Sequence, residues 1–111
     1  MIERTILWFL KNELEEPIYL EKPEPVPSTF VLFEKTGSRR TNRLMASTFA
    51  FQSYATSLLG AVELNEKVKA AVDKLIESDE IASVRLDSDY NWTDTTTKRY
   101  RYQAVFDISH Y

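Results

Sequence analysis

The side chains best suited to acid–base or nucleophilic chemistry are scarce in this sequence. His110 is its one histidine, it stands next to the last residue, and there is no cysteine. Because chain ends fray, a histidine there is poorly placed to act as a general base or a metal ligand. Serines are present, but a hydrolytic triad needs a histidine that the fold holds in place. The sequence therefore predicts no catalytic residue.

The stretch DSDYNWTD is the one candidate for a metal site. Its oxygen-bearing side chains have the opening spacing of a calcium loop: Asp87, Asp89, Asn91 and Asp94. Such a loop needs glycine at its turn, where this chain has Trp92, and a closing glutamate that is missing here. The only glycines, Gly37 and Gly60, form no phosphate-binding loop. We therefore expect no metal and no cofactor.

Basic residues form two clusters. They are Arg39, Arg40 and Arg43 in GSRRTNR, and Lys98, Arg99 and Arg101 near the end of the chain. Taken singly, each cluster is best explained as a solvated tip or strand face. The alternative is docking onto an acidic surface, where guanidinium groups can bond carboxylates in bidentate fashion. No aromatic residue interleaves the first cluster, so stacking on single-stranded nucleic acid is poorly supported.

Length and composition indicate a single α+β domain over residues 1–111. The chain is 43% hydrophobic, which supplies a core, and it carries a net charge of −3. That charge argues against a chain-wide grip on nucleic acid, and no apolar run is long enough to span a membrane. The opening MIERTILWFLKNELEE has helical periodicity and no cleavage site, so we interpret it as a folded helix and not as a signal peptide.

The first half of the chain predicts a helix, an extended connection and a long hairpin. The helix runs to about Glu15 and ends before Pro17. The proline-rich connection, residues 17–27, carries at most a short edge strand at residues 18–20. TFVLFEKTG and LMASTFAFQSYA then predict two strands around the polar tip GSRRTNR. This tip is longer than a two-residue turn, so its conformation is not specified.

The second half predicts a long helix and a second hairpin. Thr56 or Ser57 is the expected N-cap, and apolar residues keep helical spacing to about Glu77. IASVRLDSDYNW then predicts a strand, with Ala82, Val84 and Leu86 pointing inward. After the loop TDTTTK, the last strand has apolar residues at alternate positions from residue 100 to residue 108, with Arg101, Gln103 and Asp107 between them.

These elements predict a two-layer α+β fold in the order α-β-β-β-α-β-β. A mostly antiparallel sheet of four to five strands packs two helices on one face. The opposite face is then polar and of mixed charge: Arg85, Asp87, Arg101 and Gln103, with Thr48 and Gln52 beside them. Such a face is either solvated or lines a channel through which a polyanion passes without binding to the wall.

A run of motifs resembles a known family. The pattern is FVLFEKTG, a strand ending in QSYA, an alanine-rich helix, YNW, and a final RYQAVFDIS. It is similar to the tail-terminator-like neck and tail-completion proteins of long-tailed bacteriophages and prophages. The similarity covers most of residues 28–110, and its motifs are structural and not catalytic.

The resemblance implies a structural role without enzymatic activity. Members cap the tail tube, typically as a hexameric ring, and meet the head connector. It therefore implies a location in the virion neck, and in the host cytoplasm during assembly. It also implies that the protein associates with itself, and that DNA passes through the assembly without being a specific ligand. The resemblance assigns no contact residues; our own hypothesis is that Arg39, Arg40 and Arg43 contact a neighbouring subunit, for example at Glu63 or Glu66, or the tail tube. A head-completion role stays open within this class, and a small-molecule-binding or enzymatic α+β domain stays open outside it.

Overall fold

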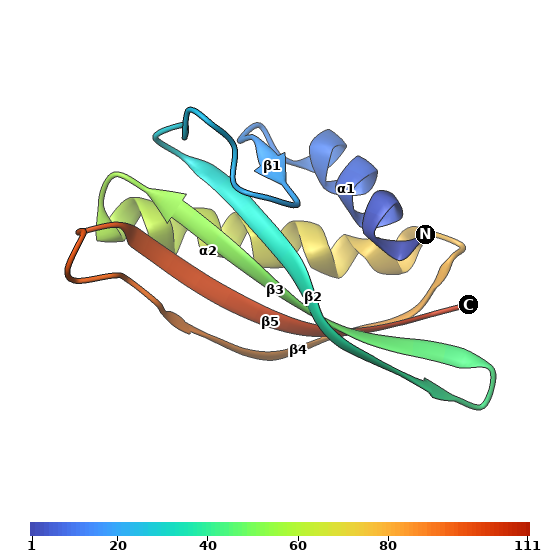
Figure 1. Cartoon of the computed structure of the whole chain (residues 1–111). Helices are drawn as coiled ribbons and strands as arrows, with labels where there is room; N and C mark the ends of the chain where they lie inside the picture. Colours follow the sequence, from blue (N-terminus) through green and yellow to red (C-terminus); the bar gives the residue numbers. More distant parts are fainter.

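The protein folds as a two-layer α+β domain with a strongly twisted sheet (Figure 1). The computed structural model describes residues 1–111 except for the side chain of Thr41. Its elements are α1 (Ile2–Glu13), β1 (Ile18–Tyr19), β2 (Phe30–Thr41), β3 (Leu44–Ala55), α2 (Leu58–Asp73), the 3-10 helix η1 (Lys74–Glu77), β4 (Ile81–Asn91) and β5 (Tyr100–His110). The predicted class and order of elements are confirmed.

The sheet has the strand order β1-β2-β3-β5-β4. β2–β3, β3–β5 and β5–β4 are antiparallel, while the two-residue β1 runs parallel to β2. Since the proline-rich segment carries β1 beside β2, one edge of the sheet is covered only at Val31 and Leu32. The rest of β2 and the whole of β4 are sheet edges within this chain.

The core lies between the helices and the inner face of the sheet. It includes Phe33 of β2, Phe51 of β3 and Phe106 of β5, all with 0% exposed surface. The Phe33 and Phe51 rings stack at 5.5 Å, and Phe106 meets Phe51 edge-on at 5.8 Å. Buried aliphatic residues of α1, α2 and η1 close over these rings: Ile2, Ile6, Leu10, Leu64, Val68, Val72 and Leu75. Ser57 caps α2 as predicted, because its Oγ accepts a hydrogen bond from the Gly60 amide at 3.0 Å.

The predicted loop GSRRTNR is wrong, because β2 and β3 stay paired through almost all of it. Ser38, Arg39 and Arg40 are matched across to β3, and the turn consists of Asn42 and Arg43 alone. Both turn residues have positive φ, 49° and 72°. A two-residue turn of that kind matches the twist of the flanking strands, and asparagine tolerates the left-handed region. The distal hairpin, residues 37–46, is called the arm below.

The prediction that Leu86 points into the core is correct in direction and wrong in burial. Leu86 is the register partner of Phe106, so it lies on the helix side, yet it is 40% exposed. β4 is an edge strand, and the helices do not extend over it at this point. The pairing also shifts between Leu86 and Ser88, so Asp87 is the extra residue of a bulge. A bulge reverses the alternation that follows it, which places Asp89 on the helix side next to Ala104.

The expectation that His110 would fray is wrong. His110 pairs with Met45 of β3 and with Ile81 of β4, so it lies inside the sheet. The amide of Tyr111 adds a bond to the Glu80 carbonyl at 3.1 Å. The last strand is therefore held on both sides almost to its final residue.

Candidate functional site

The face of the sheet that points away from the helices, called the open face below, carries the residues that the sequence marked as functional. Cross-strand register arranges them in rows from β2 through β3 and β5 to β4. These rows are Phe30, Tyr54 and Arg101; Leu32, Gln52, Gln103 and Tyr90; Glu34, Ala50, Val105 and Ser88; Gly37, Thr48, Asp107 and Arg85; and Arg39, Ala46, Ser109 and Ser83. The open face thus changes from aromatic at one end to polar and basic at the arm.

An aromatic–guanidinium stack forms the aromatic end. The Phe30 and Tyr54 rings lie 4.5 Å apart and nearly parallel. The Arg101 guanidinium lies 4.0 Å from the Trp92 ring centroid and 5.9 Å from that of Tyr54, and Arg99 lies 5.4 Å from Tyr54. Arg101 also donates to the Trp92 carbonyl at 2.6 Å. Two members of the second basic cluster are thus engaged in packing within the chain.

A chain of hydrogen bonds joins the buried amides in the middle of the open face. Gln52 Nε2 donates to Gln103 Oε1 at 3.1 Å, and Gln103 Nε2 donates to the Tyr90 hydroxyl. The Tyr54 hydroxyl completes the chain at Gln52 Oε1. Gln52 is 5% and Gln103 9% exposed, so Gln103 lies on the predicted face but is largely covered. Satisfied buried amides of this kind fix strand register more than they offer a binding group.

A polar groove lies at the arm end of the open face. Its volume is about 460 Å³, and it is lined by Arg39, Ala46, Ser83, Val84, Arg85, Asp107 and Ser109. Asp107 Oδ1 accepts from Thr48 at 2.9 Å, and Asp107 Oδ2 accepts from Arg85 at 3.5 Å. The one carboxylate in the groove is therefore already engaged. Arg39 forms no ion pair with any residue that the structure describes, so the groove offers positive charge.

The fold places only some of the polar residues predicted for the open face on that face and close to one another. Arg85, Arg101 and Gln103 all lie on the open face, whereas Asp87 occupies the bulge of β4. Arg85 and Arg101 belong to different ends of that face, one beside the groove and the other in the aromatic stack. Alternation along a strand identified the face, and only the three-dimensional register could separate its two ends.

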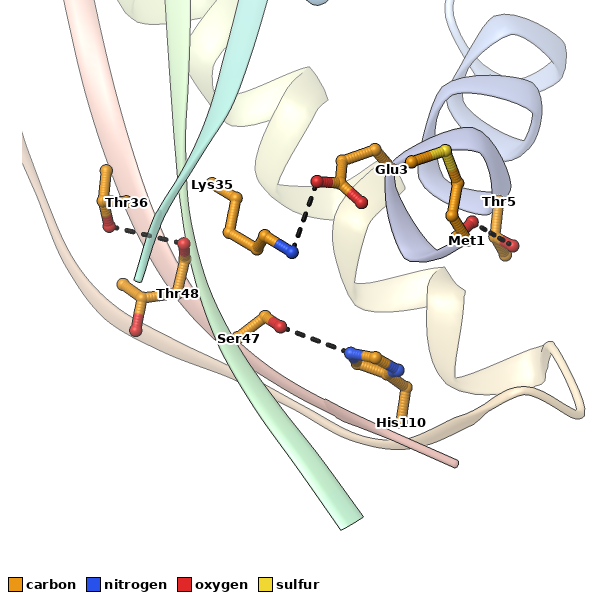
Figure 2. A network of polar contacts seen from close by, with 8 residues as sticks. All are labelled: Met1, Glu3, Thr5, Lys35, Thr36, Ser47, Thr48 and His110. Atoms are coloured by element: carbon orange, nitrogen blue, oxygen red, sulfur yellow. Dashed lines mark hydrogen bonds and ion pairs between the residues drawn. The ribbon is translucent and has the colours of Figure 1, made fainter. Parts of the chain in front are cut away.

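The arm carries the predicted contact residues Arg39, Arg40 and Arg43 on paired strands. All three are exposed. Within the described structure none of them takes part in an ion pair, and residues 37–46 contain no acidic residue. Lys35, just before the arm, is instead bound to Glu3 of α1 at 3.3 Å (Figure 2). The arm is thus a paired, basic hairpin, whereas the sequence left the conformation of this tip unspecified.

A serine–histidine pair was missed by sequence reasoning. Ser47 Oγ and His110 Nε2 lie 3.2 Å apart, joining β3 to β5 (Figure 2). Ser47 is only 1% exposed, and among the described residues no carboxylate hydrogen-bonds to His110. A nucleophile must reach its substrate, and its base needs an orienting partner. The pair therefore serves as a cross-strand link, and only the strand register could have revealed it.

The acids of DSDYNWTD are dispersed by the bulge and by local turns. Asp89 faces α2, and the side chains of Asn91 and Asp94 accept hydrogen bonds within their own loop. Hydrogen bonds from Thr96 lower the pKa of Asp94 to about 2. Among the residues that the structure describes, no group of three or more such side chains is placed to hold a metal ion.

Lys69 and Asp89 form the best-shielded ion pair between α2 and the sheet. Lys69 Nζ lies 2.8 Å from Asp89 Oδ2, which also accepts from Asn65 at 2.8 Å. The hydrogen bond from Lys69 lowers the pKa of Asp89, although burial opposes the shift. The same hydrogen bond raises the pKa of Lys69, with a further contribution from Glu66.

The pair should give the protein a defined pH dependence. A lowered carboxyl pKa contributes stability above the ordinary value of 3.8, and this stability is lost as the pH falls through the folded value. A raised lysine pKa contributes stability below 10.5, which is lost as the pH rises through the folded value. We expect Asp89→Asn to cost about 1 kcal/mol at neutral pH and less near pH 3. Urea unfolding at both pH values measures this difference, and an equal cost at both would contradict it.

Comparisons of the sequence with family models and with curated proteins assign the chain to no family. Neither the scan against protein-family models nor the search of curated proteins finds a match for this chain. In the part of the chain that the structure describes, neither helix has the length and apolar character of a membrane span.

Proposed function

We propose that this protein is a structural subunit of a long-tailed phage or prophage that caps the tail tube, joins the tail to the head, or both. The observation that carries the proposal is the basic arm. It extends paired strands to a two-residue turn and presents three arginines that have no ion-pair partner among the described residues. Such arginines can form strong bidentate hydrogen bonds with carboxylates of another surface.

The elongated shape and the two sheet edges also support a subunit of a larger assembly. The molecule measures 44 × 24 × 23 Å, and the arm extends past the helix layer (Figure 1). Free sheet edges invite pairing with another chain unless they are blocked. In the proposed ring, a hexamer by resemblance, the subunits meet one another, the tail tube protein and the head connector.

The open face suits a wall past which DNA moves. Its central groups are neutral amides and hydroxyls that bond one another, as Gln52 does with Gln103. Asp107 partly balances Arg85 at the arm end. The middle of the open face therefore has few free cations, and such a surface lets a polyanion pass without binding it. We propose that the protein acts in the virion neck after assembly in the host cytoplasm, and that it has no catalytic role.

A small-molecule-binding or enzymatic domain is the second candidate. A groove of about 340 Å³ favours it, lined by Val26, Pro27, Ser28, Tyr54, Ala55, Thr56, Lys98 and Arg99. It is open and bordered by two cations, so it would suit a small anion better than an apolar ligand. Binding of a phosphorylated or carboxylated metabolite there, seen as shifts of these residues in NMR titration, would support this candidate.

Electron microscopy of lysates from phage lacking this gene tests the proposal. Overlong or irregular tails would identify a tail terminator, because the tube would not be stopped. Tails of normal length beside separate heads would identify a joining protein. Intact infectious particles at the normal yield would overturn both roles.

A further inference from the structure

A second surface complements the groove at the arm end. Residues 73–80, called the acid corner below, end the helix layer and lead into β4. They carry four acids: Asp73, Glu77, Asp79 and Glu80. The one base among them, Lys74, is already bound to Glu13 at 3.2 Å. Ile76 stands among these acids and is 51% exposed.

Charge is distributed unevenly between the two layers. The helix segments, residues 1–16 and 57–80, contain ten acids and five bases, a net charge of −5. The β2–β3 hairpin, residues 28–55, contains one acid and four bases, a net charge of +3. A molecule that is acidic on one layer and basic on the other attracts copies of itself in one orientation.

The groove and the acid corner also agree in chemistry. On the open face the groove has one small apolar residue, Ala46, with Arg39 and Arg85 beside it, while the side chain of Val84 packs toward the core. The acid corner presents an exposed apolar side chain, Ile76, with Asp73 and Glu77 close to it in the sequence. Glu66, an earlier candidate on α2, is a weaker partner because Lys69 already binds it at 3.0 Å.

We propose that the acid corner of one copy docks in the groove of the next copy, with Ile76 directed into the groove and its acids against Arg39 and Arg85. Both surfaces lie at the same end of the molecule, one on the helix layer and one on the sheet layer (Figure 1). The contact uses a different surface of each copy, the acid corner of one and the groove of the other, so a third copy can engage the surface that remains. Such a contact is heterologous and generates a ring when it closes. This contact supplies the subunit interface of the ring proposed above and in that sense rests on it.

Disulfide trapping with purified full-length protein tests the contact directly, because the natural chain has no cysteine. One chain carries Ser83→Cys in the groove, and a second, differently tagged chain carries Glu77→Cys in the acid corner. Mixed at high concentration and mildly oxidised, they should give a disulfide heterodimer. Ser83→Cys mixed with Thr95→Cys, an exposed position in the β4–β5 loop, is the matched control and should give little product.

Charge reversal then shows whether the trapped contact is the one proposed. Arg39→Glu in the groove chain should lower the heterodimer yield about fivefold. Asp73→Arg in the acid-corner chain should restore much of it. Arg39 has no ion-pair partner among the described residues of its own chain, so the variant should fold, which circular dichroism checks. Equal yields from the test and control pairs, or a yield insensitive to Arg39→Glu, would overturn the contact.

The trapping experiment tests the contact between copies and the phage experiment tests the role in the tail, so one hypothesis can be refuted while the other stands. Specific trapping with intact phage in the absence of the gene would keep the contact and refute the role in the tail. Failed trapping with defective tails would keep the role and refute the contact.

Discussion

Phe106→Ala should lower the free energy of unfolding by roughly 3–5 kcal/mol. Phe106 is fully buried, packs edge-on against Phe51 and lies in the core shared by the sheet and both helices. The loss includes the apolar surface removed and the cavity left behind. It is a large share of the 5–15 kcal/mol typical of a whole domain. Thermal or urea unfolding followed by circular dichroism measures it.

Leu86→Ala is the matched control for this prediction. Leu86 pairs in register with Phe106 and points to the same side, but 40% of its surface is exposed. Because it leaves no closed cavity, its replacement should cost only about 1 kcal/mol. A Phe106→Ala protein with an unchanged melting temperature, or one no less stable than Leu86→Ala, would refute the placement of Phe106.

The sequence predicted the elements whose apolar residues keep a single period. β5 has apolar residues at every second position from Tyr100 to Ile108, so the buried positions of Phe106 and Ile108 follow from spacing. α2 keeps a helical period and has a serine at its N-cap, which explains why its start at Leu58 could be predicted. In both elements local preference and tertiary packing favour the same structure.

Features that depend on pairing between distant residues could not be predicted. The bulge at Asp87 has no local signature, yet it decides which side of β4 Asp89 occupies. The contact of Ser47 with His110 joins residues that only strand register brings together. The arm was mistaken for a loop because its β2 strand, residues 37–41, has no apolar residue on either face, which removes the alternation that marks a half-buried strand.

In the candidate site too, local alternation could be predicted from the sequence, whereas contacts between distant residues could not. Alternation in β4 and β5 placed Arg85, Arg101 and Gln103 on the open face, and the register agrees. The sequence did not indicate that Arg101 would stack on Trp92 at 4.0 Å. That stack engages Arg99 and Arg101 of the second basic cluster, whereas the three arginines of the arm are all exposed and lie together on a projecting hairpin.

Replacing Arg39 and Arg40 of the arm by glutamate should give a folded protein that no longer assembles on tails. Both residues are exposed and unpaired within the described structure, so their contribution to folding should stay within about 1 kcal/mol. At a docking surface the same change replaces attraction by repulsion, and like charges brought together oppose association. Complementation of phage lacking the gene, scored as infectious particles per cell, should fall by several orders of magnitude.

The control separates docking from a general effect of charge. Lys11→Glu with Lys22→Glu changes the net charge by the same amount at two other exposed positions, in α1 and in the proline-rich connection. The docking hypothesis expects this protein to complement normally, because neither residue lies on the arm. If both double variants lose activity, net charge is responsible and not the arm. If the Arg39→Glu, Arg40→Glu protein completes infectious particles at the normal yield, the arm has no docking role, and its arginines serve only to keep an exposed hairpin soluble.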